Sequence, residues 1–214
     1  MKVSDFSFQL PDELVAQQPT PERTASRLMV VSRHADEPAR HTTFAHLPEF
    51  LRAGDLLVVN RTRVVPARMF ATRVDGVTFE VFFLRSIDAA RFYAWARPGK
   101  KLRAGNVLDV AGGGRIACVG RDGHREVRFE VQDETVDALL ERCGHVPLPP
   151  YIHRGDEGGD RERYQTVYAR ERGSVAAPTA GLHFDLALLE RLRGDGVQIA
   201  EITLHVGPGT FQPL

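Results

Sequence analysis

The architecture of this chain is best predicted from the run Asp55-Leu56-Leu57-Val58-Val59-Asn60. Its four consecutive aliphatic residues predict a strand buried on both faces, because a strand with one exposed face alternates apolar and polar residues. Burial on both faces requires further layers above and below, so the run predicts a sheet covered by helices. Leu28-Met29-Val30-Val31 predicts another strand earlier in the chain.

Helices are predicted on either side of this run. Proline followed by two acids opens residues 11–17, which is a favourable start for a short helix. Near the other end, Asp185 stands at an N-cap position and Gly194 ends the helix that follows. The alternating residues 197–202 then predict a strand, an order typical of a layered α/β domain. The apolar face of the second helix is expected to consist of Leu186, Leu189 and Leu192.

The middle of the chain consists of short strand-like runs separated by turns. Residues 78–84 and 92–96 are two such runs, and Asp122-Gly123 between two others predicts a β-hairpin. Short strands at this spacing suit a small barrel or sandwich. We therefore expect an α/β fold with some α+β character, in which a small β-barrel domain is inserted into a larger layered α/β domain. The expected boundaries are residues 1–66 and 150–214 for the α/β domain and residues 67–149 for the barrel-like domain.

The composition is that of an ordinary soluble protein, with 43% hydrophobic and 26% charged residues among 214. Lys+Arg and Asp+Glu number 28 each, so any nucleic acid would have to be bound by a local basic patch. Two cysteines cannot alone form a four-thiolate zinc site, and they suit a reducing compartment. The amino terminus does not look like a secretory signal and no segment suits a bilayer span, so we expect a cytoplasmic protein without membrane contact.

Two loops rich in small residues carry the candidate chemistry. Ala176-Ala177-Pro178-Thr179-Ala180-Gly181-Leu182-His183-Phe184 places a histidine near a predicted helix start, which suits a polar or anionic ligand. Leu204-His205-Val206-Gly207-Pro208-Gly209-Thr210-Phe211 ends a strand with a histidine and two glycines. Taken singly, each pattern is more often an ordinary turn, and His205 more often a hydrogen-bonded structural histidine.

Three further stretches accompany these loops, and the five together resemble a known family. The three are Asn60-Arg61-Thr62-Arg63-Val64-Val65-Pro66-Ala67-Arg68, Pro147-Leu148-Pro149-Pro150-Tyr151-Ile152 and Asp160-Arg161-Glu162-Arg163-Tyr164-Gln165-Thr166-Val167-Tyr168-Ala169. In this order, the five stretches resemble the S-adenosylmethionine:tRNA ribosyltransferase-isomerases of queuosine biosynthesis, and the likeness extends from Leu10-Pro11 to Leu214. The resemblance implies that family's fold, a larger α/β domain with an inserted β-barrel, in agreement with the periodicity.

The resemblance also implies a reaction. The ribosyl part of S-adenosylmethionine is transferred and isomerised onto 7-aminomethyl-7-deazaguanine at the tRNA wobble position, so that epoxyqueuosine forms and adenine and methionine leave. The enzyme must remove a proton beside the sulfonium and hold the amine of the base for attack. S-adenosylmethionine is then a ribosyl-donor substrate, and neither a metal nor a redox cofactor is required.

Candidate residues for these roles follow from the resemblance. His183 and His205 can exchange protons near neutral pH, so either could be the general base or orient adenine. Tyr164, Tyr168 and Phe184 could face the sulfonium with their rings, although packing is the commoner role of an aromatic residue. The other substrate-binding candidates are Arg27, Asn60, Thr62 and Arg63 beside predicted strands, and Tyr151, Gln165, Pro178, Thr179, Ala180, Gly181, Gly207, Gly209 and Thr210.

For tRNA, three groups of basic residues could contact phosphates while the wobble base gives specificity. Taken singly, each group is more often a solvated surface. The groups are Arg61, Arg63 and Arg68; Arg97, Lys100, Lys101 and Arg103; and Arg154, Arg161, Arg163, Arg170 and Arg172.

Two departures from the family pattern leave alternatives open. Arg61 stands where the family usually has an acid, and the chain stops at Leu214, whereas family members continue into a stretch with histidine and acidic residues. One alternative is therefore a truncated, non-catalytic remnant that binds tRNA or S-adenosylmethionine, or pairs with a separate chain supplying the missing part. The other is a methyltransferase, which is disfavoured because Gly112-Gly113-Gly114 leads into a predicted strand and not into a helix.

Overall fold

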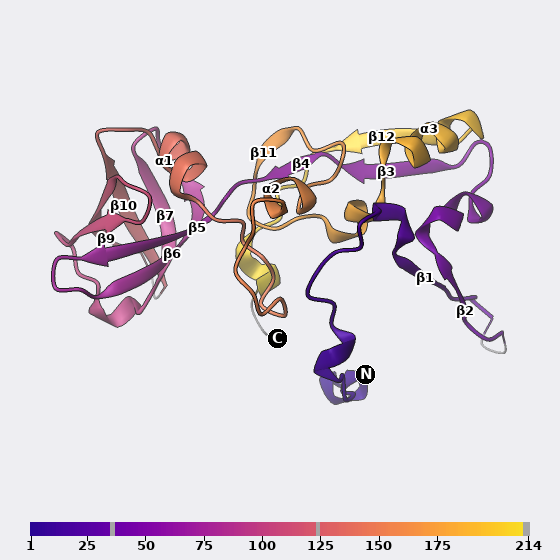
Figure 1. Cartoon of the computed structure of the whole chain (residues 1–214), viewed down its shortest axis with the longest axis horizontal. Helices are drawn as coiled ribbons and strands as arrows, with labels where there is room; N and C mark the ends of the chain where they lie inside the picture. The colour runs from indigo at the N-terminus through magenta and orange to yellow at the C-terminus, as the bar shows by residue number, and fades with distance from the viewer. Residues whose placement is uncertain (35–36, 123–124, 212–214) are drawn as a thin grey trace.

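The computed structural model describes residues 1–34, 37–122 and 125–211. A closed barrel lies at one end, and small sheets with short helices lie at the other, from which the amino-terminal segment extends (Figure 1). The predicted fold class, an α/β chain with an inserted β-barrel, is confirmed. Among the residues described, no helix is long and apolar enough to cross a membrane.

The barrel has six strands, each antiparallel to its neighbours, in the order β10-β7-β6-β5-β8-β9. Inward and outward side chains alternate along β6, which is the pattern that a closed barrel requires. Phe79, Phe92 and Phe129 fill the interior and are fully buried. The strands are β5 (Arg68–Arg73), β6 (Thr78–Ser86), β7 (Arg91–Arg97), β8 (Val107–Val110), β9 (Arg115–Asp122) and β10 (Glu126–Gln132).

Helix α1 (Val136–Cys143) adds to the barrel core through Val136, Leu139 and Leu140. The Thr135 hydroxyl caps the helix by accepting a hydrogen bond from the Ala138 amide at 3.2 Å. Gly112–Gly114 form the turn between β8 and β9 with φ between 87° and 104°, so this glycine run is a hairpin turn. Strands β9 and β10 pair as the predicted hairpin, although its turn at Gly123 lies outside the described residues.

The α/β part contains three two-stranded sheets. Strand β3 (Leu56–Asn60) runs parallel to β12 (Gln198–Ile202), and β4 (Thr62–Val64) runs parallel to β11 (Glu171–Ser174). Strand β1 (Arg27–Val30) pairs with β2 (Arg40–Thr43) in an antiparallel hairpin. The helices here are α2 (Asp160–Arg163) and α3 (Leu186–Gly194), and the 3-10 turns of the chain are η1 (Val3–Phe6), η2 (Asp12–Leu14), η3 (Arg23–Ala25), η4 (Phe44–Phe50), η5 (Gly99–Lys101), η6 (Thr179–His183) and η7 (Pro208–Phe211).

The prediction that β3 is buried on both faces is wrong. Val59 is buried against α3, but Leu56 is 59% and Val58 is 50% exposed. Helix α3 and turn η4 cover one face of the β3–β12 pair, whereas Leu56 and Val58 on the other face belong to none of the hydrophobic clusters of the described residues. The aliphatic run therefore identifies the strand correctly, but it overestimates the number of layers.

Two helix predictions also need correction. Asp185 caps α3 as predicted, with its carboxylate accepting from the Leu188 amide at 2.7 Å, but Leu186 is exposed and Leu188 joins the buried face instead. The helix predicted over residues 11–17 is a single 3-10 turn at Asp12–Leu14, none of whose residues is buried. A short helix gains most of its stability from packing, which is missing here.

The chain enters and leaves the barrel at one place. The backbones of Arg68 and His145 exchange two hydrogen bonds, from the Arg68 amide at 3.2 Å and from the His145 amide at 2.7 Å. The two connections between the barrel and the rest of the chain therefore lie side by side.

Candidate functional site

His183 lies at the end of η6, between the β1 hairpin and the aromatic side chains of the α/β core. Its Nδ1 lies 2.8 Å from the Ser26 hydroxyl, and its ring centroid lies 5.3 Å from that of Phe44. The Ser26 hydroxyl donates to the Arg23 carbonyl at 3.1 Å, so it has only lone pairs left for His183. This arrangement places the imidazole proton on Nδ1. The basic lone pair is then on Nε2, which has no partner among the described residues.

The charges around His183 favour its neutral form. Burial, together with the nearby guanidinium groups of Arg163 and Arg23, lowers the pKa of His183. Arg23 donates to the carbonyls of Leu182 and Glu162, at 2.9 and 3.1 Å, and Arg163 donates to a backbone carbonyl. Neither arginine forms an ion pair within the described part of the chain. The site therefore combines a neutral imidazole with two guanidinium groups whose charge is only partly offset by Asp185, which suits an anionic group.

The three candidate aromatics are buried. Phe184 contacts Phe44 edge to face at 4.8 Å and Tyr168 at 6.5 Å, whereas Tyr164 packs in a separate cluster with Val64. Burial raises the pKa of both Tyr164 and Tyr168 to about 12. Both phenols are therefore protonated at neutral pH and cannot act as bases there. Gly181 lies directly against the Tyr168 hydroxyl, and a Cβ at this position would also lie 2.8 Å from a Thr166 methyl group.

His205 lies in a second loop, after β12. Its Nδ1 is 2.8 Å from the Thr62 hydroxyl, and its ring lies over Gly173. The Asn60 amide donates to the Leu204 carbonyl at 2.8 Å and accepts from its amide at 3.0 Å, which fixes the loop. The sequence-predicted residues Asn60, Thr62 and His205 thus come together. No hydrogen bond, ion pair or ring contact among the described residues links Asn60, Thr62 or His205 directly to His183.

A Gly173→Ala variant tests how tightly the loop is fixed. A Cβ on Gly173 would lie 2.8–3.0 Å from the ring atoms of His205, and Gly173 has φ +144°, which side chains rarely tolerate. We expect a loss of about 1–3 kcal/mol in the free energy of unfolding, measured by urea denaturation. Gly194→Ala is the matched control, because nothing lies within 4 Å of its Cβ position. Equal stability of the two variants would show that His205 moves aside freely.

The remaining predicted residues lie apart from both histidines or on exposed loop surfaces. The Gln165 side chain donates to the Val64 carbonyl at 2.8 Å and accepts from its amide at 2.9 Å, so it holds the edge of β4. Arg27 and Arg63 are exposed and have no ion-pair partner in the described residues. Tyr151 is 52% exposed. Pro178 is partly buried, Thr179 and Ala180 are exposed beside η6, and Gly207, Gly209 and Thr210 are exposed around η7.

Comparison with known proteins identifies the family. The family described as "Queuosine biosynthesis protein" matches residues 3–214 of this chain. The chain belongs to this family. Among solved structures, an S-adenosylmethionine tRNA ribosyltransferase from Thermotoga maritima is 30% identical, with a TM-score of 0.38. The match covers 94% of this chain and 58% of that protein, so the chain spans less than two thirds of its length.

In this member of the queuosine biosynthesis family, sequence reasoning missed the residues that hold His183. Ser26, Arg23 and Phe44 all come from the segment around β1, more than 130 positions away along the chain. Arg23 and Ser26 precede the predicted strand at residues 28–31, whereas ligands in open α/β sheets bind at the carboxyl ends of strands. No local pattern therefore marks these residues, and only the fold brings Ser26 to His183.

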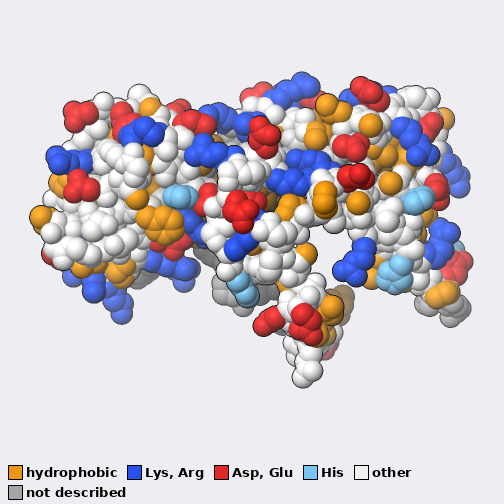
Figure 2. All heavy atoms as spheres, in the orientation of Figure 1, with side chains coloured by type: hydrophobic (Ala, Val, Ile, Leu, Met, Phe, Trp, Pro, Cys, Tyr) orange, Lys and Arg blue, Asp and Glu red, His pale blue; other side chains and the backbone are white. Residues whose placement is uncertain are grey.

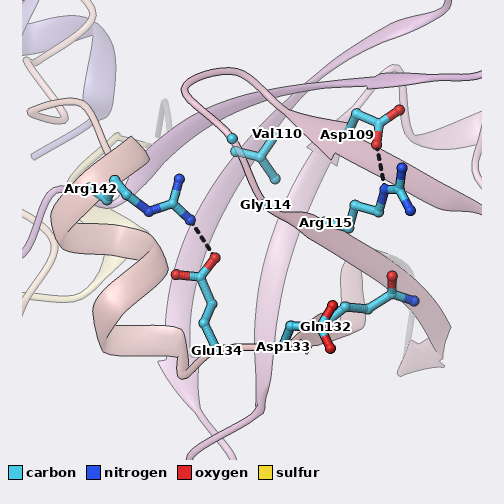
Figure 3. A pocket seen from close by; sticks show the side chains of 9 residues that line it. Asp109, Val110, Gly114, Arg115, Gln132, Asp133, Glu134 and Arg142 are labelled. Carbon is cyan, nitrogen blue, oxygen red and sulfur yellow. Dashed lines mark hydrogen bonds and ion pairs between the residues drawn. The ribbon is translucent and has the colours of Figure 1, made fainter.

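The barrel of this family member carries a separate pocket of about 590 Å³, beside the Gly112–Gly114 turn. Its charged groups are largely paired with one another, as Arg115 with Asp109 and Arg142 with Glu134 (Figure 3). Asp133 adds a further negative charge. Three acids against two arginines make this pocket unsuitable for an anion, and the hairpin at its wall differs from the glycine loop of a methyltransferase. No group of three or more metal-ligating side chains occurs within residues 1–34, 37–122 and 125–211.

Proposed function

We propose that this chain takes part in ribosyl transfer from S-adenosylmethionine to 7-aminomethyl-7-deazaguanine at the wobble position of tRNA. Isomerisation of the ribosyl group gives epoxyqueuosine-tRNA, and adenine and methionine are released. Membership of the queuosine biosynthesis family supports the pathway. The observation that carries the mechanism is the half-buried His183, whose Nδ1 is held by Ser26 and whose Nε2 is free of partners in the described structure.

His183 is proposed as the general base. The reaction begins with removal of a proton from the carbon beside the sulfonium, and the free Nε2 lone pair is a suitable acceptor. Ser26 fixes the ring orientation by its contact with Nδ1. The sulfonium activates the carbon because it stabilises the negative charge that develops there. His205, which is exposed and bonded to Thr62, is proposed to orient a substrate.

The groups around His183 suit the other parts of S-adenosylmethionine. Arg23 and Arg163 carry positive charge without an ion-pair partner in the described structure, so they could hold the carboxylate of the methionine moiety. The rings of Phe184 and Tyr168 pack together near His183, and Gly181 has room for no side chain because the Tyr168 hydroxyl lies directly against it. S-adenosylmethionine and tRNA are the proposed substrates, no metal or redox cofactor is proposed, and the proposed location is the cytoplasm.

Product analysis tests this proposal. The chain is incubated with S-adenosylmethionine and tRNA carrying 7-aminomethyl-7-deazaguanine, and the small molecules are separated by chromatography. Adenine and methionine in equal amounts are the expected products. S-adenosylhomocysteine would instead indicate methyl transfer, and tRNA binding without either product would favour a binding role. The same assay on a version extended by downstream coding sequence shows whether turnover requires additional residues.

The pH dependence of adenine release follows from the environment of His183. A general base works when deprotonated, and the pKa of His183 is lowered from 6.5 by burial and by the arginines. We therefore expect the midpoint of the decrease in kcat/KM at low pH to lie below 6.5. The measurement is a pH profile of adenine release at constant ionic strength. A decrease centred above pH 6.5 would contradict a base in this environment.

A further inference from the structure

A pocket at the junction of the barrel with the α/β part contains an excess of arginine. It has a volume of about 220 Å³ and is lined by residues of β4, α1, α2 and β11. Its charged lining residues are Arg63, Arg161, Arg172, Glu141 and Glu162. Three arginines against two glutamates give this pocket a net positive charge, in contrast to the acidic pocket on the barrel. Figure 2 shows that Lys and Arg side chains, with acidic ones between them, gather where the barrel meets the rest of the chain.

The register of β4 and β11 brings two of these cations together. Arg63 and Arg172 are direct partners in the parallel pair, where like charges on neighbouring strands repel each other. Arg172 lies 3.2 Å from the Glu141 carboxylate, whereas Arg63 has no ion pair among the described residues. The pairing of Arg63 with Arg172 does not evidently stabilise the fold. It does provide a cation that is available to a ligand.

The third arginine competes for the same carboxylate. Arg161 lies 3.4 Å from Glu141 and donates to the Gly144 carbonyl at 2.8 Å. The Glu141 side chain is 59% exposed, so its ion pairs contribute little and are readily exchanged. Two sets of hydrogen bonds fix the positions of the arginines. The Gln165 side chain bonds to the backbone of Val64, next to Arg63. At the start of α2, which carries Arg161, Asp160 accepts two hydrogen bonds from Arg154.

We infer that the pocket formed by Arg63, Arg161 and Arg172 binds a backbone phosphate of an RNA substrate. The inference rests on the proposed function for the choice of RNA as the ligand. The pocket is smaller than the 300–1,000 Å³ that is usual for whole small-molecule ligands, so it suits a single charged group better than S-adenosylmethionine. Guanidinium groups bind phosphate oxygens through paired hydrogen bonds, and Glu141 holds two of them near the pocket until phosphate replaces it.

The test is the salt dependence of RNA binding. Fluorescence anisotropy is measured with a labelled anticodon stem–loop RNA at several NaCl concentrations for the unmodified chain, Arg63→Gln and Arg193→Gln. Arg193 is the matched control, since it is also exposed and without an ion pair in the described residues but lies in α3. Arg63→Gln is expected to weaken binding and to reduce the slope of log K against log salt by about 0.7–1. Arg193→Gln is expected to keep the original slope.

A second variant distinguishes ligand binding from a structural role. Glu141→Gln removes the carboxylate that competes with phosphate, so it is expected to bind RNA about two- to fivefold more tightly. An ion-pair network with only a structural role would give no such gain. Unchanged slopes for Arg63→Gln, or no tighter binding by Glu141→Gln, would overturn the inference. If RNA binding depends on Arg63 but no adenine is released, the phosphate site stands and the proposed reaction fails.

Discussion

A His183→Ala variant is expected to release adenine from S-adenosylmethionine about 10²–10⁴-fold more slowly than the unmodified chain, the usual contribution of a general base. The half-buried imidazole is held by Ser26 at 2.8 Å and kept neutral by its surroundings. Alanine offers no acceptor in place of Nε2. The loss should appear in kcat, measured by chromatography of released adenine at saturating substrate, because proton removal belongs to the chemical step.

His46→Ala is the control for this experiment. The Nδ1 of His46 also contacts a hydroxyl, that of Thr43 at 2.9 Å, but its side chain is exposed in η4. This variant therefore removes the same kind of hydrogen bond without touching the proposed site, and it should keep normal turnover. If His205→Ala shows the large loss and His183→Ala does not, His205 is the base. Near-normal turnover in both variants would exclude both histidines.

A Phe129→Ala variant is expected to destabilise the barrel by about 3–5 kcal/mol, because a large side chain is removed from a closed core. Phe129 is fully buried in β10 and stacks on Phe92 with a centroid distance of 5.5 Å. Neighbouring strands are fixed by the closed hydrogen-bond network, so the cavity cannot collapse easily. Trp95, the single tryptophan, lies in β7 and reports unfolding of the barrel by its fluorescence during urea denaturation.

Phe70→Ala provides the comparison on the outer surface of the same barrel. Phe70 is 39% exposed in β5 and contacts only the ring of His145 among the aromatic residues described. Its removal should cost about 1 kcal/mol or less. Similar losses for the two variants would mean that the barrel interior is not the main source of its stability.

The fold could be predicted from local patterns where the pattern reflects a single physical cause. Short alternating runs between glycine turns predicted the barrel, and Asp185 predicted the start of α3. The run at residues 55–60 predicted a strand but not its exposure, because side-chain type does not show how many layers a chain supplies. Leu56 and Val58 belong to a face that α3 does not reach.

The candidate site was predictable only as separate pieces. The sequence indicates His183 and His205 in loops of small residues, and their catalytic and binding roles stay predictions. It gives no indication that Ser26 orients His183, or that Gly173 supports the His205 ring. These contacts join segments separated by 157 and 32 positions, respectively. Long-range pairing is a property of the folded topology, whereas residue spacing carries only local information.

The paired backbones of Arg68 and His145 bring the two ends of the barrel insertion together. Because the two ends of the barrel insertion adjoin, a linker of a few glycines could connect the same two points of the host chain that the barrel now connects. The parallel pairing of β3 with β12 uses no residue of the barrel. Such an insertion can be gained, exchanged or deleted during evolution without a change in the strand connections of the α/β part. A chain in which a short linker replaces residues 68–145 should therefore keep the β3–β12 sheet, although Val65 and Val175, which pack in the barrel core, would become exposed.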